Sequence, residues 1–359
     1  MSTSAITEAT HIAEPAPYPP SWVDRIIDWV RALPGPSWLF YLALGATLVL
    51  SEFAVKWLDG TYPVGAINPF HAVYAGIGIY AFGAMHYLDD YAETAIASFR
   101  PALTVSEREY EQLRYRLTTL PARPTAILTV VMLLIVAATL LLSSRETVNI
   151  YASLKVYTSP LGYVIEGIAV LIWAATAGPF IYHVYHQIQV IDLIYTRHTA
   201  INLFHLRPLY AFSKLTARAA LILIFLIYPA FLISPRVLED PFVWVSSIGI
   251  SLIALWNFLG PLLGIHRLLI AEKDRLHHEI ATNIEEVCDR IDRALVSDNL
   301  DKMEQMKIAL EALVTRQDRL ERTPTWPWHS DTPRVIASAL LLPIVIYIIQ
   351  VIIDRLLDL

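Results

Sequence analysis

The sequence predicts an all-α protein that crosses a membrane several times. Apolar residues make up 55% of its 359 positions and charged residues only 17%, with a mean hydropathy of +0.49. These values are typical of multi-pass membrane proteins. The apolar stretches have the length of about 20 residues that a membrane-spanning helix needs, and they lack the alternation expected of barrel strands.

Seven stretches are long and apolar enough to span a bilayer as helices. They lie at 38–58, 69–88, 124–143, 160–183, 216–234, 242–263 and 335–353. The first six fall within residues 38–263, and the seventh belongs to a final helix over 335–357.

The distribution of Lys and Arg predicts the orientation. The N-terminal segment and the loops after the second, fourth and sixth spans hold 21 of the 27 basic residues. Because positive residues stay on the cytoplasmic side, we expect a cytoplasmic N-terminus, and an odd number of spans then places the C-terminus outside. The sequence thus predicts a multi-pass protein of the cell membrane, in contact with the lipid bilayer.

Before the first span, residues 1–20 are predicted to be a disordered tail because they are rich in Pro, Ala and polar residues. Residues 21–33 are expected to form an amphipathic helix on the membrane surface. Trp22 and Trp29 belong to its apolar stripe, whereas Asp24 is expected to face away from it.

Three helical segments are expected in the cytoplasm. Ser106 and Glu109 have the spacing of a capping box, which predicts a short helix after them. Beyond the fourth span no Gly or Pro occurs before Pro208, so that helix is expected to continue over 184–206. Residues 265–322 predict an antiparallel coiled-coil hairpin, because apolar residues recur every three or four positions on both sides of a turn at 297–299.

An elbow over 324–334 joins this hairpin to the last span. Its prolines exclude a continuous helix, and Trp326 and Trp328 suit the headgroup layer. His329 belongs to the same segment, and Asp331 is a candidate cap for the last helix. We expect a short rigid joint that passes motion of the hairpin on to that helix.

The last span carries the most suggestive pattern of polar residues. Ala339, Pro343, Tyr347, Gln350 and Asp354 share one helical face, and apolar residues cover the rest. One interpretation is a packed interface with another helix. The other is that the face lines an aqueous path, with Asp354 attracting cations at its outer mouth.

Other spans contain isolated polar residues. Glu52 and Lys56 are four residues apart and can pair on one helical face. Glu166 is expected to face protein or water, because a carboxylate facing lipid is costly. Asn257 predicts a hydrogen bond between helices or, as an alternative, a permeation site.

Histidines raise the question of a metal or haem. His183 and His186 are three residues apart and are expected to face the same side of a helix. No other span carries a matching pair, so we predict no cofactor and interpret both as hydrogen-bonding residues near the membrane boundary. Phosphate-loop, nucleophile-elbow and HExxH motifs are absent from the sequence, which predicts neither an enzyme nor a nucleic-acid partner.

Two charged clusters lie at the predicted inner ends of spans. One contains Asp89, Asp90 and Glu93, and the other contains Arg207, Lys214 and Arg218. The carboxylates are expected to pair with cytoplasmic arginines or, less favourably, to bind a cation. The basic residues are expected to reach anionic headgroups or to hold the inner ends of spans together.

In layout the chain resembles the seven-transmembrane ion channel superfamily that includes the insect odorant and gustatory receptors. Residues 184–206 and 265–320, the elbow and the span 335–353 occupy the places of that superfamily's extended helices, split last helix and pore helix. The resemblance implies a homo-oligomer, a tetramer in that superfamily, that acts as an ion channel or channel-like receptor with its last helix lining the pore. An alternative is a non-conducting scaffold or sensor whose hairpin binds a cytoplasmic protein, and a third possibility is a redox protein that uses the histidines.

Overall fold

The computed structural model describes residues 16–143, 159–199, 203, 206–226, 241–296, 300–328 and 331–356. Within these residues the chain forms ten α-helices, two short 3-10 turns and no strand. The helices are α1 (Trp22–Arg31), α2 (Ser37–Leu58), α3 (Pro69–Phe99), α4 (Glu107–Thr118), α5 (Ala122–Ser143), α6 (Pro160–Arg197), α7 (Tyr210–Phe225), α9 (Pro241–Val296), α10 (Leu300–Glu321) and α11 (Thr332–Leu356).

Six stretches of the described helices are long and apolar enough to cross a membrane. They are Ser37–Leu58, Ala122–Thr139, Pro160–Arg197, Arg207–Phe225, Ser247–Ala294 and Thr332–Ile353. Helix α3 is not among them, since its histidines, tyrosines and glycines lower its hydropathy. The predicted all-α class is therefore confirmed, together with several apolar helices of membrane-crossing length.

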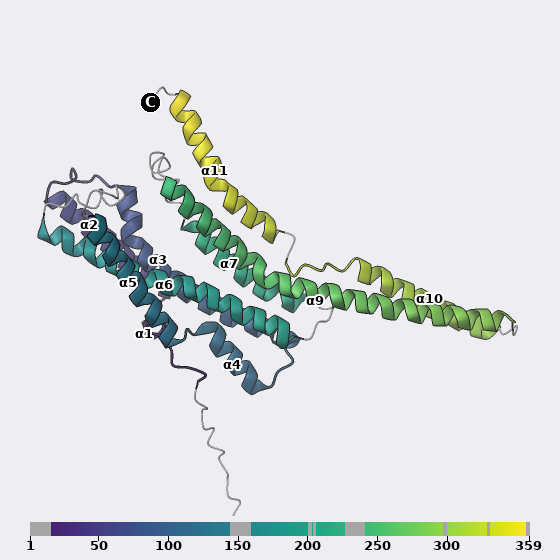
Figure 1. The fold of residues 1–359 in the computed structure, drawn as a ribbon. Helices are drawn as coiled ribbons and strands as arrows, with labels where there is room; N and C mark the ends of the chain where they lie inside the picture. Colours follow the sequence, from purple (N-terminus) through teal and green to yellow (C-terminus); the bar gives the residue numbers. More distant parts are fainter. Residues whose placement is uncertain are drawn as a thin grey trace, which may run out of the picture.

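Helix α3 occupies the middle of the bundle, where it packs against α2, α6 and α7 (Figure 1). Helix α5 lies on α6, and α9 lies on α6 and α7. Three aromatic rings join α3, α6 and α7: Phe99 lies 4.7 Å from Phe212 and 5.6 Å from Tyr195, measured between ring centroids. Their complete burial ties three helices together at one end of the bundle.

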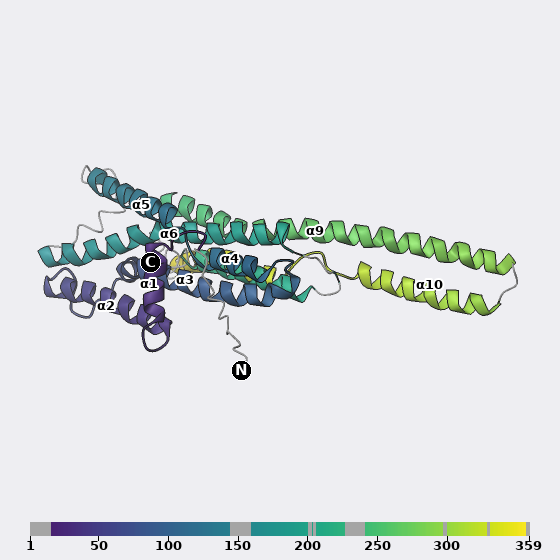
Figure 2. The ribbon, with the colours of Figure 1, turned by 90° about the horizontal axis from the view of Figure 1, so that it is seen from below.

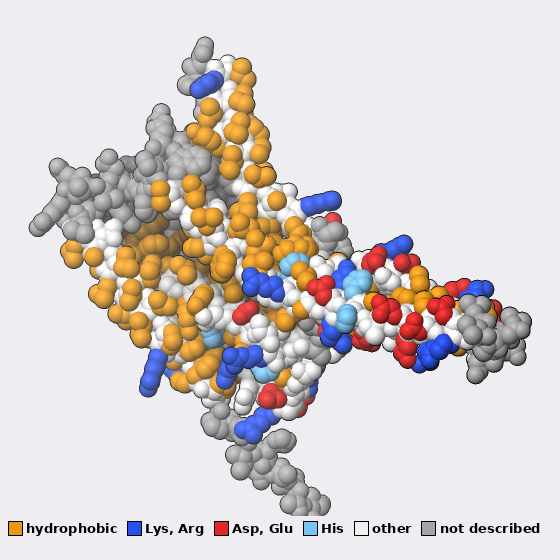
Figure 3. All heavy atoms as spheres, turned by 45° about the vertical axis from the view of Figure 1, so that its right-hand side comes forward, with side chains coloured by type: hydrophobic (Ala, Val, Ile, Leu, Met, Phe, Trp, Pro, Cys, Tyr) orange, Lys and Arg blue, Asp and Glu red, His pale blue; other side chains and the backbone are white. Residues whose placement is uncertain are grey.

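Residues 265–296 of α9 and helix α10 form a long arm. Helix α9 continues through Pro261 for 56 residues, and α10 returns along it in the opposite direction. Ile280 on α9 and Leu320 on α10 are fully buried, which agrees with the predicted coiled-coil spacing. The arm projects beyond the other helices (Figure 2). Apolar side chains cover the bundle and α11, whereas acidic and basic side chains are dense on the arm (Figure 3).

The start of the described chain is held more firmly than a disordered tail would be. The hydroxyl of Tyr18 donates a 2.8 Å hydrogen bond to the carbonyl of Thr119. Asp24 is buried rather than turned outward, because its carboxylate accepts hydrogen bonds from Ser21 and from the amide of Leu120. Burial raises the pKa of Asp24. The rest of the predicted tail, residues 1–15, lies outside the described residues.

The predicted helical extension over 184–206 ends early. Helix α6 stops at Arg197, and the carbonyl of His198 instead accepts a 3.0 Å hydrogen bond from the amide of Thr104. Thr199 then forms a bridge to Leu103. This pairing with the segment after α3 replaces helical hydrogen bonds, so the absence of Gly and Pro did not suffice to predict a longer helix.

Candidate functional site

Helix α11, which carries the predicted polar stripe, has little protein around it. Its main neighbour among the described residues is α7. Leu341, Ile344 and Ile348 are 57%, 43% and 50% exposed. An exposed surface this apolar indicates contact with lipid or with another protein chain.

The stripe divides into two parts. Ala339 is half-buried and packs at the edge of the core, so the stripe begins as an interface within the chain. Tyr347, two turns further, is also half-buried. The side chains of Pro343, Gln350 and Asp354 lie outside the described part of the chain. The pore interpretation therefore depends on the second half of the stripe, from Tyr347 onward.

The elbow is held against α9 by a stack of rings. Trp326 lies parallel to His266, with ring centroids 3.7 Å apart, and Trp328 stacks on Trp326 at 4.3 Å. His266 also makes a 2.9 Å hydrogen bond through Nδ1 with the carbonyl of Thr325. These contacts fix the direction in which the chain leaves the arm toward α11. Of the other predicted elbow residues, Asp331 is exposed directly before α11, and His329 lies outside the described residues.

Helix α10 is joined to α9 just before the elbow. The ammonium of Lys273 donates hydrogen bonds to the carbonyls of Glu321 and Thr323, at 2.8 and 3.0 Å. These carbonyls end a helix and have no helical donor, so a lysine is well suited to satisfy them. The end of α10 and the stacked tryptophans are thus fixed to the same stretch of α9.

The predicted pair in the first span is present and deeply buried. Lys56 Nζ lies 2.7 Å from Glu52 Oε1, and neither residue is more than 2% exposed. His71 of α3 approaches the same carboxylate, with Nδ1 3.5 Å from Oε1. Glu166 of α6 is 8% exposed and therefore faces protein. A group of charges buried this fully is costly unless its members neutralise each other.

The predicted histidine pair does not converge on one point. His183 Nε2 lies 2.7 Å from Oδ1 of the buried Asp89, which also accepts a hydrogen bond from Gln187. His186 Nε2 lies instead 3.0 Å from the carbonyl of Arg116. Within the described residues no three ligating side chains gather as a metal site would require. The geometry fits the hydrogen-bonding interpretation of both histidines.

The carboxylates near the end of α3 pair as expected. Asp90 forms a 2.7 Å ion pair with Arg31 of α1, and Glu93 forms a 3.1 Å pair with Arg114 of α4. Asp89 turns the other way, toward α6. The cluster therefore connects three neighbouring helices to α3.

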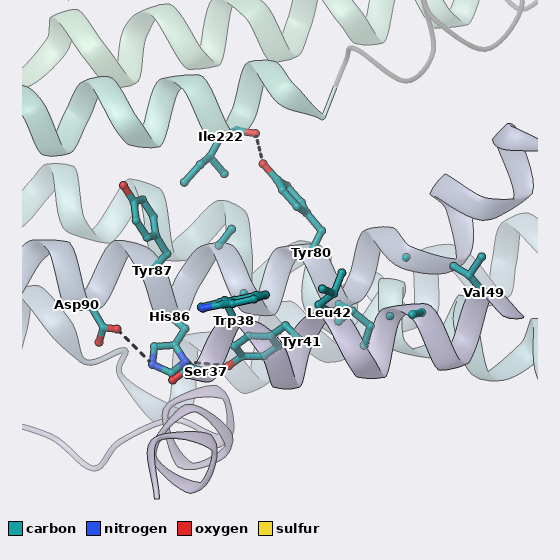
Figure 4. Close-up of a pocket in the computed structure, with 16 residues that line it drawn as sticks. Ser37, Trp38, Tyr41, Leu42, Val49, Tyr80, His86, Tyr87, Asp90 and Ile222 are labelled. Carbon is teal, nitrogen blue, oxygen red and sulfur yellow. Dashed lines mark hydrogen bonds and ion pairs between the residues drawn. The ribbon is translucent and has the colours of Figure 1, made fainter. Parts of the chain in front are cut away.

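A groove of about 870 Å³ lies between α2 and α3, below Ile222 of α7 (Figure 4). Its walls are mostly apolar or aromatic, and polar groups gather at one end. There the hydroxyl of Tyr41 lies 3.0 Å from Nδ1 of His86, and His86 Nε2 lies 3.4 Å from Asp90. We call this the apolar groove. No sequence pattern predicts it, because its residues come from three helices without a shared spacing.

Asn257 of α9 is 5% exposed, so its side chain faces protein. Sequence reasoning also missed the partner of the elbow, His266, since no local pattern places it beside Trp326.

Compared with known proteins, the chain matches no protein-family model, no curated protein and no solved structure.

Proposed function

We propose that the chain is a homo-oligomeric ion channel or channel-like receptor of the cell membrane, in which α11 of each copy lines a central pore. The observation that supports this most is that α11 combines the polar stripe with low burial: only 6% of an 18-residue apolar stretch within Thr332–Ile353 is buried within one chain. A helix beside a symmetry axis obtains its neighbours from other copies. Tyr347, Gln350 and Asp354 would face the pore, and the apolar faces would meet lipid and protein.

The proposed topology counts α3 as a seventh span. Although less apolar than the other six, α3 is surrounded by α2, α6 and α7, and its histidines, His71 and His86, are each 2% exposed, so both face protein rather than lipid. The N-terminus and the arm would then be cytoplasmic, and the end of α11 would be outside, as the basic residues predict. This layout keeps the resemblance to the seven-transmembrane ion channel superfamily, in which subunits meet as tetramers.

The elbow supplies a route from the arm to the pore. Because Trp326 and Trp328 are stacked on α9 at His266, a change in the position of α9 would move the beginning of α11 with it. The contact of α11 with α7 provides the other side of this joint. Gating would thus use a rigid-body shift of the elbow and α11.

A non-conducting scaffold or sensor is the second candidate. The arm extends past the bundle and carries exposed ion pairs such as Arg290 with Glu286, at 2.6 Å. Such a surface suits a cytoplasmic protein partner as well as another copy of the chain. The redox alternative receives less support, because both His183 and His186 are held by protein groups.

The oligomer and the conductance test these candidates together. The purified chain is inserted in lipid nanodiscs for mass measurement and in planar bilayers for current recording. We expect a closed oligomer, a tetramer by the resemblance, and a cation-selective current. Asp354→Asn should reduce the preference for cations because it removes a negative charge from the proposed pore, and Gln350→Leu should lower the conductance because it removes a polar group.

Ile348→Val is the matched control, since Ile348 lies in the exposed apolar part of the same helix. It should leave selectivity and conductance unchanged. A monomer in lipid that never conducts would overturn the channel proposal and favour the scaffold. Currents that Asp354→Asn and Gln350→Leu leave unaltered would remove this face of α11 from the pore.

A further inference from the structure

A second pocket, of about 480 Å³, lies where α3, α7 and the beginning of α11 meet. Lys214 and Arg218, one turn apart on α7, both line it. Lys214 is exposed and Arg218 is half-exposed, and neither takes part in an ion pair among the described residues. We call this the basic pocket.

Arg218 is held in position by α3. Its guanidinium carbon lies 3.8 Å from the centre of the Tyr91 ring, and its Nε donates a 2.7 Å hydrogen bond to the hydroxyl of Tyr87. An arginine stacked on a ring in this way has little rotational freedom left. Its two terminal nitrogens make no hydrogen bond to the described residues, so their donors remain available to an anion.

The basic pocket adjoins the apolar groove. Tyr87 and Ile222 line both, and in Figure 4 the ring of Tyr87 points from α3 toward the helix that carries Ile222. The groove runs along α2 from Ser37 to Val49, about 18 Å at 1.5 Å per residue. The hydrocarbon core of a bilayer is roughly 30 Å thick, so one leaflet contributes about half of that. The groove is slightly longer than one leaflet is deep, which is long enough for an acyl chain.

We propose that the two pockets together bind one anionic glycerophospholipid of the inner leaflet. Its phosphate is held by Lys214 and Arg218, and an acyl chain lies in the apolar groove between α2 and α3. Exposed Trp38 and Leu42 along the rim of the groove leave it open sideways, so a lipid enters from the bilayer. The assignment depends on the membrane insertion and orientation proposed above, but not on conduction.

The charges nearby fit a monoanionic headgroup. Asp90, at the polar end of the groove, is neutralised by Arg31. Asp331, the carboxylate in the basic pocket, opposes an anion there, and two cations against one carboxylate leave a net positive pocket. Replacement of Asp331 by Asn should therefore tighten binding.

The site also contacts α11, the helix that we propose shifts during gating. Val335 and Ile336, in the first turns of α11, line the basic pocket. Ile336 is 3% exposed and belongs to the core. A bound lipid would fill the space between α7 and α11, and it would therefore favour the arrangement in which α11 stays close to α7.

Lipid binding by the full chain tests the proposal. The purified chain is reconstituted in nanodiscs of phosphatidylcholine with increasing phosphatidylglycerol, and the lipid retained after transfer to detergent is measured by native mass spectrometry. We expect one phosphatidylglycerol per chain. Each cation near an anionic headgroup strengthens binding about fivefold. In the double variant Lys214→Gln/Arg218→Gln the affinity for the lipid should therefore weaken about 25-fold.

Matched variants distinguish this site from nonspecific adsorption of lipid. Gly76→Leu places a side chain in the groove, where an added Cβ meets no atom within 4 Å, and it should also weaken binding. Gly167→Leu on α6 is its control, because an added Cβ at Gly167 is equally free and Gly167 does not line the groove. Arg123→Gln, at the beginning of α5, is the control for a lost basic residue on the same side of the membrane.

The outcomes either support or overturn the proposal. Equal losses in Arg123→Gln would mean adsorption to a basic surface. Displacement of the lipid by inorganic phosphate, together with normal lipid binding in Gly76→Leu, would mean that the basic pocket binds a free anion instead of a lipid headgroup. Normal binding in both Gly76→Leu and Lys214→Gln/Arg218→Gln would place any retained lipid elsewhere. Specific binding by a chain that never conducts would retain this site and reject only the channel.

Discussion

Replacing Lys56 by Met removes one partner of a fully buried ion pair. Lys56 is 0% exposed, its ammonium lies 2.7 Å from Glu52, and the Glu52 carboxylate is almost as deeply buried. Loss of the ammonium leaves that carboxylate inside the protein without its main counter-charge. Breaking a buried pair in this way costs about 3–5 kcal/mol, a large part of the ~5–15 kcal/mol that typically stabilises a fold.

The double variant Glu52→Gln/Lys56→Met gives the sharper result. With both members of the pair neutral, neither has to be kept as a buried ion, so most of the loss in the free energy of unfolding should be recovered. Unfolding in detergent, monitored by tryptophan fluorescence, measures both variants. Lys307→Met is the control, because Lys307 and its partner Glu304 are 3.8 Å apart and mostly exposed, and such a pair contributes about 0–1 kcal/mol.

Two results would refute this reasoning. If Lys56→Met cost no more than Lys307→Met, water would have to reach the pair and the region would not be dry. If the double variant were as unstable as Lys56→Met, or more so, the cost would come from lost packing rather than from an uncompensated charge.

Three further changes test the packing and the capping. Tyr195→Phe removes a buried 2.9 Å hydrogen bond to the carbonyl of Leu209 and should lower the free energy of unfolding by about 1 kcal/mol in the same assay; a neutral result would mean that water replaces the hydroxyl. Gly178→Val should cost about 1–3 kcal/mol, since a Cβ there would lie 2.8 Å from the carbonyl oxygen of Leu128, and equal stability would mean that α5 and α6 separate freely. Hydrogen bonds from Ser106 lower the pKa of Glu109. The stability that the Glu109 carboxylate gives to the beginning of α4 should therefore be complete above the ordinary pKa of 4.5 and be lost as the pH falls through the lowered value. Hydrogen exchange at the beginning of α4 should show this loss in the parent chain and not in Glu109→Gln; the same pH dependence in the variant would assign it to another group.

Local rules predicted much of the fold. The Ser106 capping box and the apolar spacing around Ile280 depend on residues close in sequence, and the structure has both features. The failures came from long-range contacts. Asp24 was expected to face outward because its neighbours define an amphipathic pattern, but its carboxylate accepts a hydrogen bond from the amide of Leu120. Helix α6 stops at Arg197 because Leu103, on a segment far earlier in the chain, pairs with Thr199.

The candidate sites were less predictable than the elements. Spacing identified Glu52 with Lys56, since a pair four residues apart is local on a helix. The partner of His183, Asp89, and the partner of Trp326, His266, belong to other helices, and their distances depend on how the bundle packs. The two adjoining pockets arise in the same way from α2, α3, α7 and the beginning of α11.

The unbroken course of α9 has a mechanical consequence. At 56 residues it is about 84 Å long, and the stretch beyond His266 accounts for about 45 Å of that length. In the proposed gating, a force on the distant tip would act through this length and move the beginning of α11 at the joint where Trp326 and Trp328 stack on His266. A partner bound at the tip would then exert a larger torque on α11 than a ligand bound near that joint.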